Sequence, residues 1–281
     1  MGDVVRILRN AVCVAAVASL WASPASAAAP ENVEIVAGDH KVKSVLFKPD
    51  GPGPFPGIVA LHGCEGLLNP NGTLSSRYID WGERLVKAGF SVLYIDSYGT
   101  RGQGNQCRTR SSVRTDRERV TDTHAARHWL QTQNFIKPDH VSLLGWSSGA
   151  ISVLWSVRPR ARVRDDKPDF RSAVAFYPGC RRLDAAAWSA RMPTLILVGG
   201  ADDVVSARAC EQMVAGARGR SARATIIVYP GAYHDFDHPN RALQTRTGYI
   251  FSTEGTGRVH TGSNPAARSD SHRRVLQWLG R

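Results

Sequence analysis

The chain has 281 residues, 42% of them hydrophobic and 21% charged, and it carries a formal net charge of +12. This length supports one sizeable hydrophobic core, and the proportion of hydrophobic to charged residues excludes a disordered or repetitive chain. The arginines gather in several places, at Arg108–Arg119, Arg158–Arg164 and Arg218–Arg223. Because no nucleic-acid-binding motif accompanies them, we expect solvated basic surfaces rather than nucleic-acid binding, and such surfaces would also attract anionic substrates.

Residues 1–27 have the pattern of a signal peptide. Two arginines precede a short apolar run, Ala11–Ala22, and Ala25–Ala27 supplies small residues for a cleavage site. The run is too short to span a bilayer, so stable membrane insertion is not expected, and an uncleaved anchor helix is the alternative. We expect a secreted or periplasmic protein that is cleaved near Ala27, with residues 28–281 forming a single domain.

The mature chain alternates predicted strands with predicted helices. The strands are a short opening hairpin followed by apolar runs typical of buried strands, at Val33–Val36, Val42–Phe47, Gly57–Leu61, Phe90–Ile95, His140–Leu144, Ala173–Tyr177, Thr194–Val198 and Ala224–Tyr229. Helices are predicted at Ser75–Ala88, Val113–Gln131, Ile151–Val157, Ala207–Ala217 and Ser269–Leu279. This alternation predicts an α/β fold with an open, mostly parallel sheet covered by helices on both faces.

The connections between these elements are short, so they leave no room for a large lid domain. The longest irregular segment, His238–Asn264, is expected to be a surface loop near the functional site.

The segment Gly145–Gly149 has the pattern Gly-x-Ser-x-Gly, directly after a predicted strand and directly before a predicted helix. This context is that of a nucleophile elbow, a sharp turn that lifts a serine hydroxyl clear of the sheet. The following helix N-terminus adds positive potential where negative charge develops during acyl transfer. We therefore predict Ser147 as a nucleophile.

A serine nucleophile needs a base to remove its proton and a carboxylate to orient that base. Asp202 follows the predicted strand Thr194–Val198, and His234 follows Ala224–Tyr229, in the chain order expected of this architecture. Both lie at the carboxyl ends of strands, where open α/β sheets bind ligands. Asp203 is the alternative acid, but we favour Asp202 at the tip of the turn and expect Asp203 to cap the next helix.

Other histidines could in principle bind a metal, but their surroundings do not favour it. His124 and His128 are four residues apart on one helix, but no acidic residue completes a metalloprotease motif there. His238 follows Asp235 and Asp237 closely, and we interpret these three as solvated loop residues. No metal ligand set is predicted.

The oxyanion hole requires two backbone N–H donors. One is predicted at Ser148, directly after the nucleophile, and the other in the glycine-rich segment His62–Gly66. We favour the amide of Cys64, and Gly63 and Glu65 remain alternatives.

The cysteines that remain after the predicted cleavage are even in number, at Cys64, Cys107, Cys180 and Cys210. In an oxidising compartment this predicts disulfides, and four cysteines allow three pairings. We favour Cys64–Cys107 and Cys180–Cys210, because each pair joins loops at the same end of the predicted sheet.

Several of these segments together resemble the dienelactone hydrolase family, particularly its secreted bacterial branch. They occur in matching order at His62–Gly66, Asp96–Cys107, Gly145–Gly149, Tyr177–Cys180, Gly199–Cys210 and Tyr229–Phe236. The resemblance implies an α/β-hydrolase fold without a lid or a cofactor, and it supports the triad assignment. Founding members have a cysteine nucleophile and an oxyanion-loop glutamate, where this chain has Ser147 and Gly63.

The resemblance also suggests substrate-binding residues. Arg101 lies near the position where such enzymes hold a substrate carboxylate, and a guanidinium pairs with a carboxylate through two hydrogen bonds. A surface arginine in a basic loop is the alternative. Trp146, beside the predicted nucleophile, is the second candidate for substrate contact.

These patterns together predict a serine hydrolase that cleaves small carboxylic esters or lactones through an acyl-enzyme. A serine peptidase or amidase on the same fold is the first alternative. A non-catalytic, hydrolase-like binder of anionic envelope material is the second. The substrate's acyl and alcohol groups and the oligomeric state are not fixed by the sequence.

Overall fold

The computed structural model describes residues 2, 29–161, 163 and 165–280. The predicted signal peptide lies outside these residues, apart from Gly2. At the centre is an eight-stranded sheet in the order β1-β2-β4-β3-β5-β6-β7-β8. Its strands are β1 (Glu31–Ala37), β2 (His40–Phe47), β3 (Phe55–Leu61), β4 (Ser91–Ile95), β5 (Ile136–Trp146), β6 (Ala173–Phe176), β7 (Thr194–Gly199) and β8 (Ala224–Tyr229).

The sheet is mostly parallel, as predicted. Strand β2 pairs antiparallel with both β1 and β4, while the remaining neighbours, from β4 through β3 to β8, are parallel. The parallel strands β3 to β7 are apolar and buried along most of their length because helices cover both faces. Their carboxyl ends meet at one edge of the sheet, where the functional loops begin.

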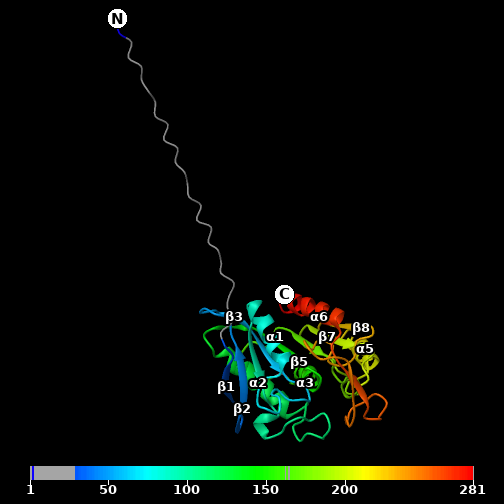
Figure 1. The fold of residues 1–281 in the computed structure, drawn as a ribbon. Coiled ribbons are helices and arrows are strands. Elements are labelled where there is room, and N and C mark those ends of the chain that lie inside the picture. Colours follow the sequence, from blue (N-terminus) through cyan, green and yellow to red (C-terminus); the bar gives the residue numbers. More distant parts are fainter. Residues whose placement is uncertain (1, 3–28, 162, 164, 281) are drawn as a thin grey trace.

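The helices are α1 (Ser76–Lys87), α2 (Glu118–Gln131), α3 (Ser148–Ser156), α4 (Arg181–Ala185), α5 (Ala207–Gly216) and α6 (Pro265–Leu279). One hydrophobic core packs the sheet against α2, α3 and α5, and a second packs its other face against α1 and α6. Figure 1 shows the same layered arrangement, with α1 and α6 close together and β8 beside α5. Within the described part of the chain, no helix combines the length and hydropathy needed to cross a bilayer.

Several boundaries differ from the sequence prediction. Helix α2 begins at Glu118 rather than Val113, because the preceding residues form a turn closed by a hydrogen bond of 2.7 Å from the Arg114 amide to the Glu118 carboxylate. Helix α6 begins four residues early, at Pro265, because the Asn264 side chain accepts the Ala267 amide at its N-terminus and proline fits the first helical turn.

The segment predicted to be irregular, His238–Asn264, contains a small antiparallel pair, β9 (Gln244–Arg246) and β10 (Val259–Thr261). Its Ile250 amide donates to the Cys107 carbonyl (3.0 Å), and its Thr253 amide donates to the Asp203 carbonyl (2.8 Å). The Gly262 amide donates to the His234 carbonyl at 2.9 Å. The segment therefore packs against three loops at the carboxyl edge of the sheet.

Two disulfides close that same end of the fold. Cys64 is bonded to Cys107, and Cys180 is bonded to Cys210, which is the pairing favoured from the sequence. The first joins the loop after β3 to the loop after β4, and the second joins the loop after β6 to α5.

Candidate active site

Ser147 occupies a strained turn between β5 and α3. Its φ of 50° and ψ of −115° are unfavourable for a residue with a side chain. The flanking glycines make this turn possible: a Cβ on Gly145 would lie 2.8 Å from the Gly149 carbonyl carbon, and one on Gly149 would lie 2.2 Å from the Leu61 oxygen. The local sequence thus explains how the strand and helix approach closely enough to expose the serine hydroxyl.

Ser147, His234 and Asp202 form a continuous hydrogen-bonded relay. The Ser147 Oγ lies 3.0 Å from His234 Nε2, and His234 Nδ1 lies 2.7 Å from an oxygen of Asp202. Since a carboxylate only accepts, Nδ1 carries the proton shared with Asp202, and Nε2 is left to accept the serine hydroxyl proton. His234 and Asp202 are 4% and 7% exposed, so solvent competes little with these bonds.

The electrostatics of the relay suit a base. Burial disfavours the charged imidazolium, but the charge and hydrogen bond of Asp202 outweigh burial and raise the pKa of His234 above its usual value. An imidazole that gains proton affinity in this way is a stronger acceptor for the Ser147 proton.

Asp202 and Asp203 have separate partners. Besides His234, Asp202 accepts the backbone amides of Val204 and Val205 at 2.9 and 3.0 Å, which fixes its carboxylate. Asp203 instead holds His260, accepting its amide at 2.8 Å and facing its Nδ1 at 2.7 Å. The expectation that Asp203 caps the next helix was wrong.

Ser206 caps helix α5 instead, since its hydroxyl accepts the Ala209 amide. Through its two contacts with His260, Asp203 anchors the segment that contains β10 to the loop that carries Asp202.

The loop after β3 runs beside Ser147. A Cβ on Gly63 would lie 3.5 Å from the Ser147 Cβ. The Gly63 amide donates to the Tyr78 hydroxyl at 2.9 Å, which removes it from the three candidate oxyanion donors in this loop. Neither the Cys64 amide nor the Ser148 amide donates to another described residue, so both stay available to a ligand.

The two predicted substrate-binding residues have other contacts. Trp146 is fully buried, stacks on Phe176 and donates its indole N–H to Asp237 at 2.7 Å. Arg101 pairs through two hydrogen bonds with Asp122, at 2.8 and 2.9 Å, and also donates to the Ser97 carbonyl. Trp146 is a core residue, and the Arg101 guanidinium is already occupied, so the structure corrects both expectations.

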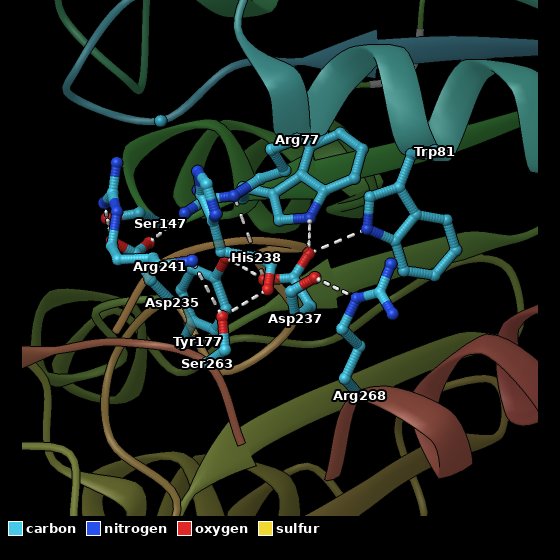
Figure 2. Close-up of polar contacts among 12 residues, drawn as sticks. Arg77, Trp81, Ser147, Tyr177, Asp235, Asp237, His238, Arg241, Ser263 and Arg268 are labelled. Atoms are coloured by element: carbon cyan, nitrogen blue, oxygen red, sulfur yellow. Dashed lines mark hydrogen bonds and ion pairs between the residues drawn. The ribbon is translucent and has the colours of Figure 1, made fainter. Parts of the chain in front are cut away.

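Asp237 is a buried acceptor rather than a solvated loop residue. One of its oxygens accepts the indole N–H groups of Trp81 and Trp146, both at 2.7 Å, and the other accepts the Tyr177 hydroxyl at 2.5 Å. Figure 2 shows Asp237 between Trp81, Tyr177 and Arg268, the last of which donates to its backbone carbonyl at 3.1 Å. Asp237 thus fixes Trp146, the residue before Ser147, and Tyr177, the residue after β6.

Asp235, directly after His234, is the second buried carboxylate. It lies 2.5 Å from Arg77 of α1 and is also bonded to Arg241, which in turn pairs with Glu65 in the loop after β3 at 2.9 Å (Figure 2). Although burial favours the neutral acid, these two guanidinium groups hold the pKa of Asp235 far below its usual range. The loop that contains His234 and the loop after β3 are therefore joined by ion pairs that no sequence pattern indicated.

Among the described residues, no group of three or more His, Cys, Asp or Glu side chains is arranged to hold a metal ion. Burial lowers the pKa of His124 to about 4, and its ring packs on Phe170.

Residues 42–281 match the dienelactone hydrolase family. The chain belongs to this family. None of the curated proteins shows a significant sequence match. Similar solved structures include a putative dienelactone hydrolase from Klebsiella pneumoniae (TM-score 0.70, 18% identity, covering 91% of this chain and 99% of that one). A dienelactone hydrolase-like promiscuous phosphotriesterase from metagenomic libraries has a TM-score of 0.66 and 20% identity, covering 92% and 98%.

An esterase from Pyrococcus furiosus is also similar, with a TM-score of 0.59 and 17% identity, covering 90% of this chain and 92% of that one. These likenesses confirm the α/β-hydrolase fold. Membership of the dienelactone hydrolase family supports hydrolase activity for this chain.

Proposed function

We propose that this member of the dienelactone hydrolase family is a serine hydrolase that cleaves small carboxylic esters or lactones. The observation that carries the proposal is the relay from Ser147 through His234 to Asp202, with distances of 3.0 and 2.7 Å. It joins a strained nucleophile, a base of raised pKa and a fixed carboxylate, which is the combination that acyl transfer requires.

In the proposed acylation step, the Ser147 oxygen forms a bond to the ester carbonyl carbon while its proton passes to His234 Nε2. The carbonyl oxygen becomes an oxyanion that accepts hydrogen bonds from the backbone N–H groups of Ser148 and Cys64. The carbon–oxygen bond to the alcohol then breaks, the carbonyl re-forms, and His234 returns its proton to the leaving alcohol. Asp202 stabilises the imidazolium between these two events.

Deacylation repeats these steps with water as the nucleophile. His234 takes a proton from water, the resulting tetrahedral intermediate collapses, and Ser147 recovers its proton as the carboxylic acid leaves. For a lactone the released alcohol and acid are parts of one molecule.

The surroundings favour small substrates. Gly179 lacks a side chain beside Ile151 and Val205, where a Cβ would lie 3.2 and 3.8 Å from them. Ile151 is one helical turn from Ser147, and Val205 follows the Asp202 loop. A small, partly apolar surface of this kind suits a short acyl or alcohol group.

We also propose that the protein is exported. The leader pattern of residues 1–27 and the two disulfides are compatible with an oxidising compartment. N-terminal sequencing of the protein from a periplasmic or culture fraction should give a mature chain that begins near Ala28, and an intact Met1 would contradict export with cleavage.

The test of the proposed chemistry is Ser147→Ala. We expect loss of p-nitrophenyl ester hydrolysis by about four to six powers of ten, because the acyl-enzyme no longer forms. Its melting temperature should stay close to that of the unchanged protein. Retained ester hydrolysis in a folded Ser147→Ala protein would refute the site.

The substrate class requires a direct comparison. Similar structures include a phosphotriesterase and an acylaminoacyl peptidase from Pyrococcus horikoshii, the latter at 13% identity with 41% of that chain covered. Side-by-side turnover of matched ester, lactone, peptide amide and phosphotriester substrates should favour the carboxylic esters or lactones. A higher kcat/KM for peptide amides would replace the proposal with a peptidase.

A further inference from the structure

Arg119 is a fully buried cation at the start of α2. One terminal nitrogen donates to the Ser148 hydroxyl at 3.0 Å, and the other donates to the His62 carbonyl at 2.7 Å. Its guanidinium also lies over the Tyr98 ring, 4.9 Å from the ring centre. Ser148 directly follows Ser147, and His62 begins the proposed oxyanion loop. Tyr98 lies in the loop after β4.

Arg119 forms no direct ion pair, although the charge of Asp96 lies close enough to interact with its guanidinium. Among the described residues no carboxylate pairs with it, and its Nε has no hydrogen-bond partner. Arginine stays protonated in proteins, and an unpaired buried charge is strongly destabilising. An apolar side chain of similar size would avoid this penalty, so packing alone does not explain an arginine here.

Arg127 provides the contrast within the same helix. It too is buried, but it lies 2.6 Å from Asp165 and donates to the Pro168 carbonyl at 3.1 Å. The Nε of Arg127, like that of Arg119, has no hydrogen-bond partner. The paired carboxylate is therefore what makes Arg127 a neutralised structural arginine, two turns away from Arg119.

The two acceptors of Arg119 belong to the two halves of the proposed oxyanion hole. Ser148 supplies one backbone donor, and His62 lies two residues before Cys64, which supplies the other. The two acceptors come from segments separated by more than eighty residues, and Arg119 joins both with one rigid group. A planar guanidinium of this kind fixes the distance between its acceptors better than a flexible ammonium would.

We propose that Arg119 is a positioning residue of the oxyanion hole. It holds the Ser148 and His62–Cys64 segments at a fixed separation and places a positive charge behind them, which the tetrahedral anion then neutralises. This inference rests on the proposed acyl-transfer function. It explains why no carboxylate pairs directly with the guanidinium: the anion beside it forms only during the reaction, when stabilisation lowers the barrier.

The neighbouring imidazole is consistent with this role. Burial and the charge of Arg119 hold the pKa of His62 well below its usual value, so His62 is neutral and adds no second cation. Its Nδ1 donates to the Gly63 carbonyl at 2.8 Å, which orients the next peptide of the oxyanion loop.

The experiment compares Arg119→Met and Arg119→Lys with Arg127→Met as the matched control. We measure kcat and KM for a p-nitrophenyl ester, the melting temperature, and the Ki of an alkyl trifluoromethyl ketone. That ketone forms a tetrahedral adduct on the serine and so reports oxyanion stabilisation. Arg119→Met should lower kcat about 10²- to 10³-fold with little change in KM, as for loss of an oxyanion donor, and weaken the ketone in parallel.

Arg119→Lys should recover part of both losses, because the charge returns without the two-point bridge. Arg127→Met should lower the melting temperature but keep kcat within about threefold, since it touches neither oxyanion segment. Ser148→Ala keeps the buried charge and removes one anchor, so it supplies the test even if Arg119→Met does not fold. It should lower kcat and ketone affinity together, by about tenfold.

The inference is overturned if Arg119→Lys and Ser148→Ala both keep the kcat and ketone Ki of the unchanged protein. It is also overturned if folded Arg119→Met loses no more activity than Arg127→Met. These outcomes differ from failure of the proposed function, in which the unchanged protein itself neither hydrolyses esters nor forms the ketone adduct.

Discussion

Two buried groups of charged residues meet behind the same edge of the sheet, and they differ in the cation that faces the carboxylate. In the relay, Asp202 faces the imidazole of His234, whose charge changes near neutral pH. In the neighbouring cluster, Asp235 faces the guanidinium groups of Arg77 and Arg241, which stay charged at all working pH values. The first arrangement can accept and return a proton, whereas the second can only hold loops in place.

Proton transfer therefore belongs to the Asp202–His234 pair, and the Asp235 cluster positions the loops. The two are adjacent in sequence, since His234 and Asp235 are consecutive, and Asp235 adopts a left-handed φ of 67° that turns the chain between them. Substitutions in the relay should therefore affect turnover in folded protein, and substitutions in the cluster should affect folding first.

Among substitutions of the two carboxylates, Asp202 and Asp235, and their neighbours, the largest effect on turnover is expected from Asp202→Asn. It removes the charge that orients His234 and should lower kcat by about 10³- to 10⁴-fold in a folded protein. Asp203→Asn is the matched control, and its loss should be less than about tenfold, because Asp203 contacts His260 rather than His234. Steady-state kinetics of both variants on one ester decide the point, and equal losses would remove Asp202 from the relay.

Asp237 belongs to the same cluster, because its carboxylate lies 3.9 Å from Arg77, and Asp237→Ala should test the positioning role of the cluster. It would leave two indole N–H groups and the Tyr177 hydroxyl without their buried acceptor, so we expect a loss of about 3 kcal/mol or more in the free energy of unfolding. Urea denaturation measures this loss. Asp139→Asn, at an exposed ion pair with His140, should leave the denaturation midpoint unchanged. A stable Asp237→Ala protein would show that the cluster is dispensable.

Removing each disulfide in turn should distinguish effects on the site from effects on the stability of the fold. They close loops of similar length, with sequence separations of 43 and 30, so their removal should destabilise the fold by similar amounts, about 3–4 kcal/mol. Only Cys64 lies in the proposed oxyanion loop. We expect Cys64→Ser/Cys107→Ser to lower kcat of the folded fraction on the order of tenfold.

Cys180→Ser/Cys210→Ser should keep its kcat while losing comparable stability. Thermal denaturation and active-site-normalised kinetics of the two double variants measure both quantities. If both double variants lowered kcat equally, the Cys64–Cys107 disulfide would have no specific role in positioning the proposed oxyanion loop.

The smallest effect concerns pH. The proposed base must be neutral to accept the Ser147 proton, and the pKa of His234 is raised, so kcat/KM should fall as pH drops through a value above 6.5. In Asp202→Asn the raising charge is gone and burial remains, so the residual activity should extend to lower pH. A pH profile of both proteins checks the sign, and an unshifted acid limb would show that Asp202 does not set the proton affinity of His234.

Local patterns made the relay predictable from the sequence. The Gly145–Gly149 turn, the order of serine, acid and histidine, and the strands before each of them are all short-range features. Because parallel strands end at one edge, these features were sufficient to bring Ser147, Asp202 and His234 together without any long-range contact being known.

The remaining features depend on contacts that no local pattern encodes. Arg241 meets Glu65 across 176 positions, and Arg119 meets His62 across 57. A basic segment in the sequence does not reveal which arginine turns inward, so Arg119 was grouped with solvated charges. Trp146 was misassigned for a related reason: proximity to Ser147 along the chain does not tell which face of β5 its side chain occupies.

The most direct measurement is the covalent labelling of the purified mature protein with a fluorophosphonate, followed by mass spectrometry of its peptides. Such probes phosphonylate a serine only where a base activates it. We expect stoichiometric labelling of the peptide that contains Ser147, with labelling suppressed in His234→Ala. An unlabelled Ser147, or equal labelling in His234→Ala, would contradict a base-activated nucleophile at this position.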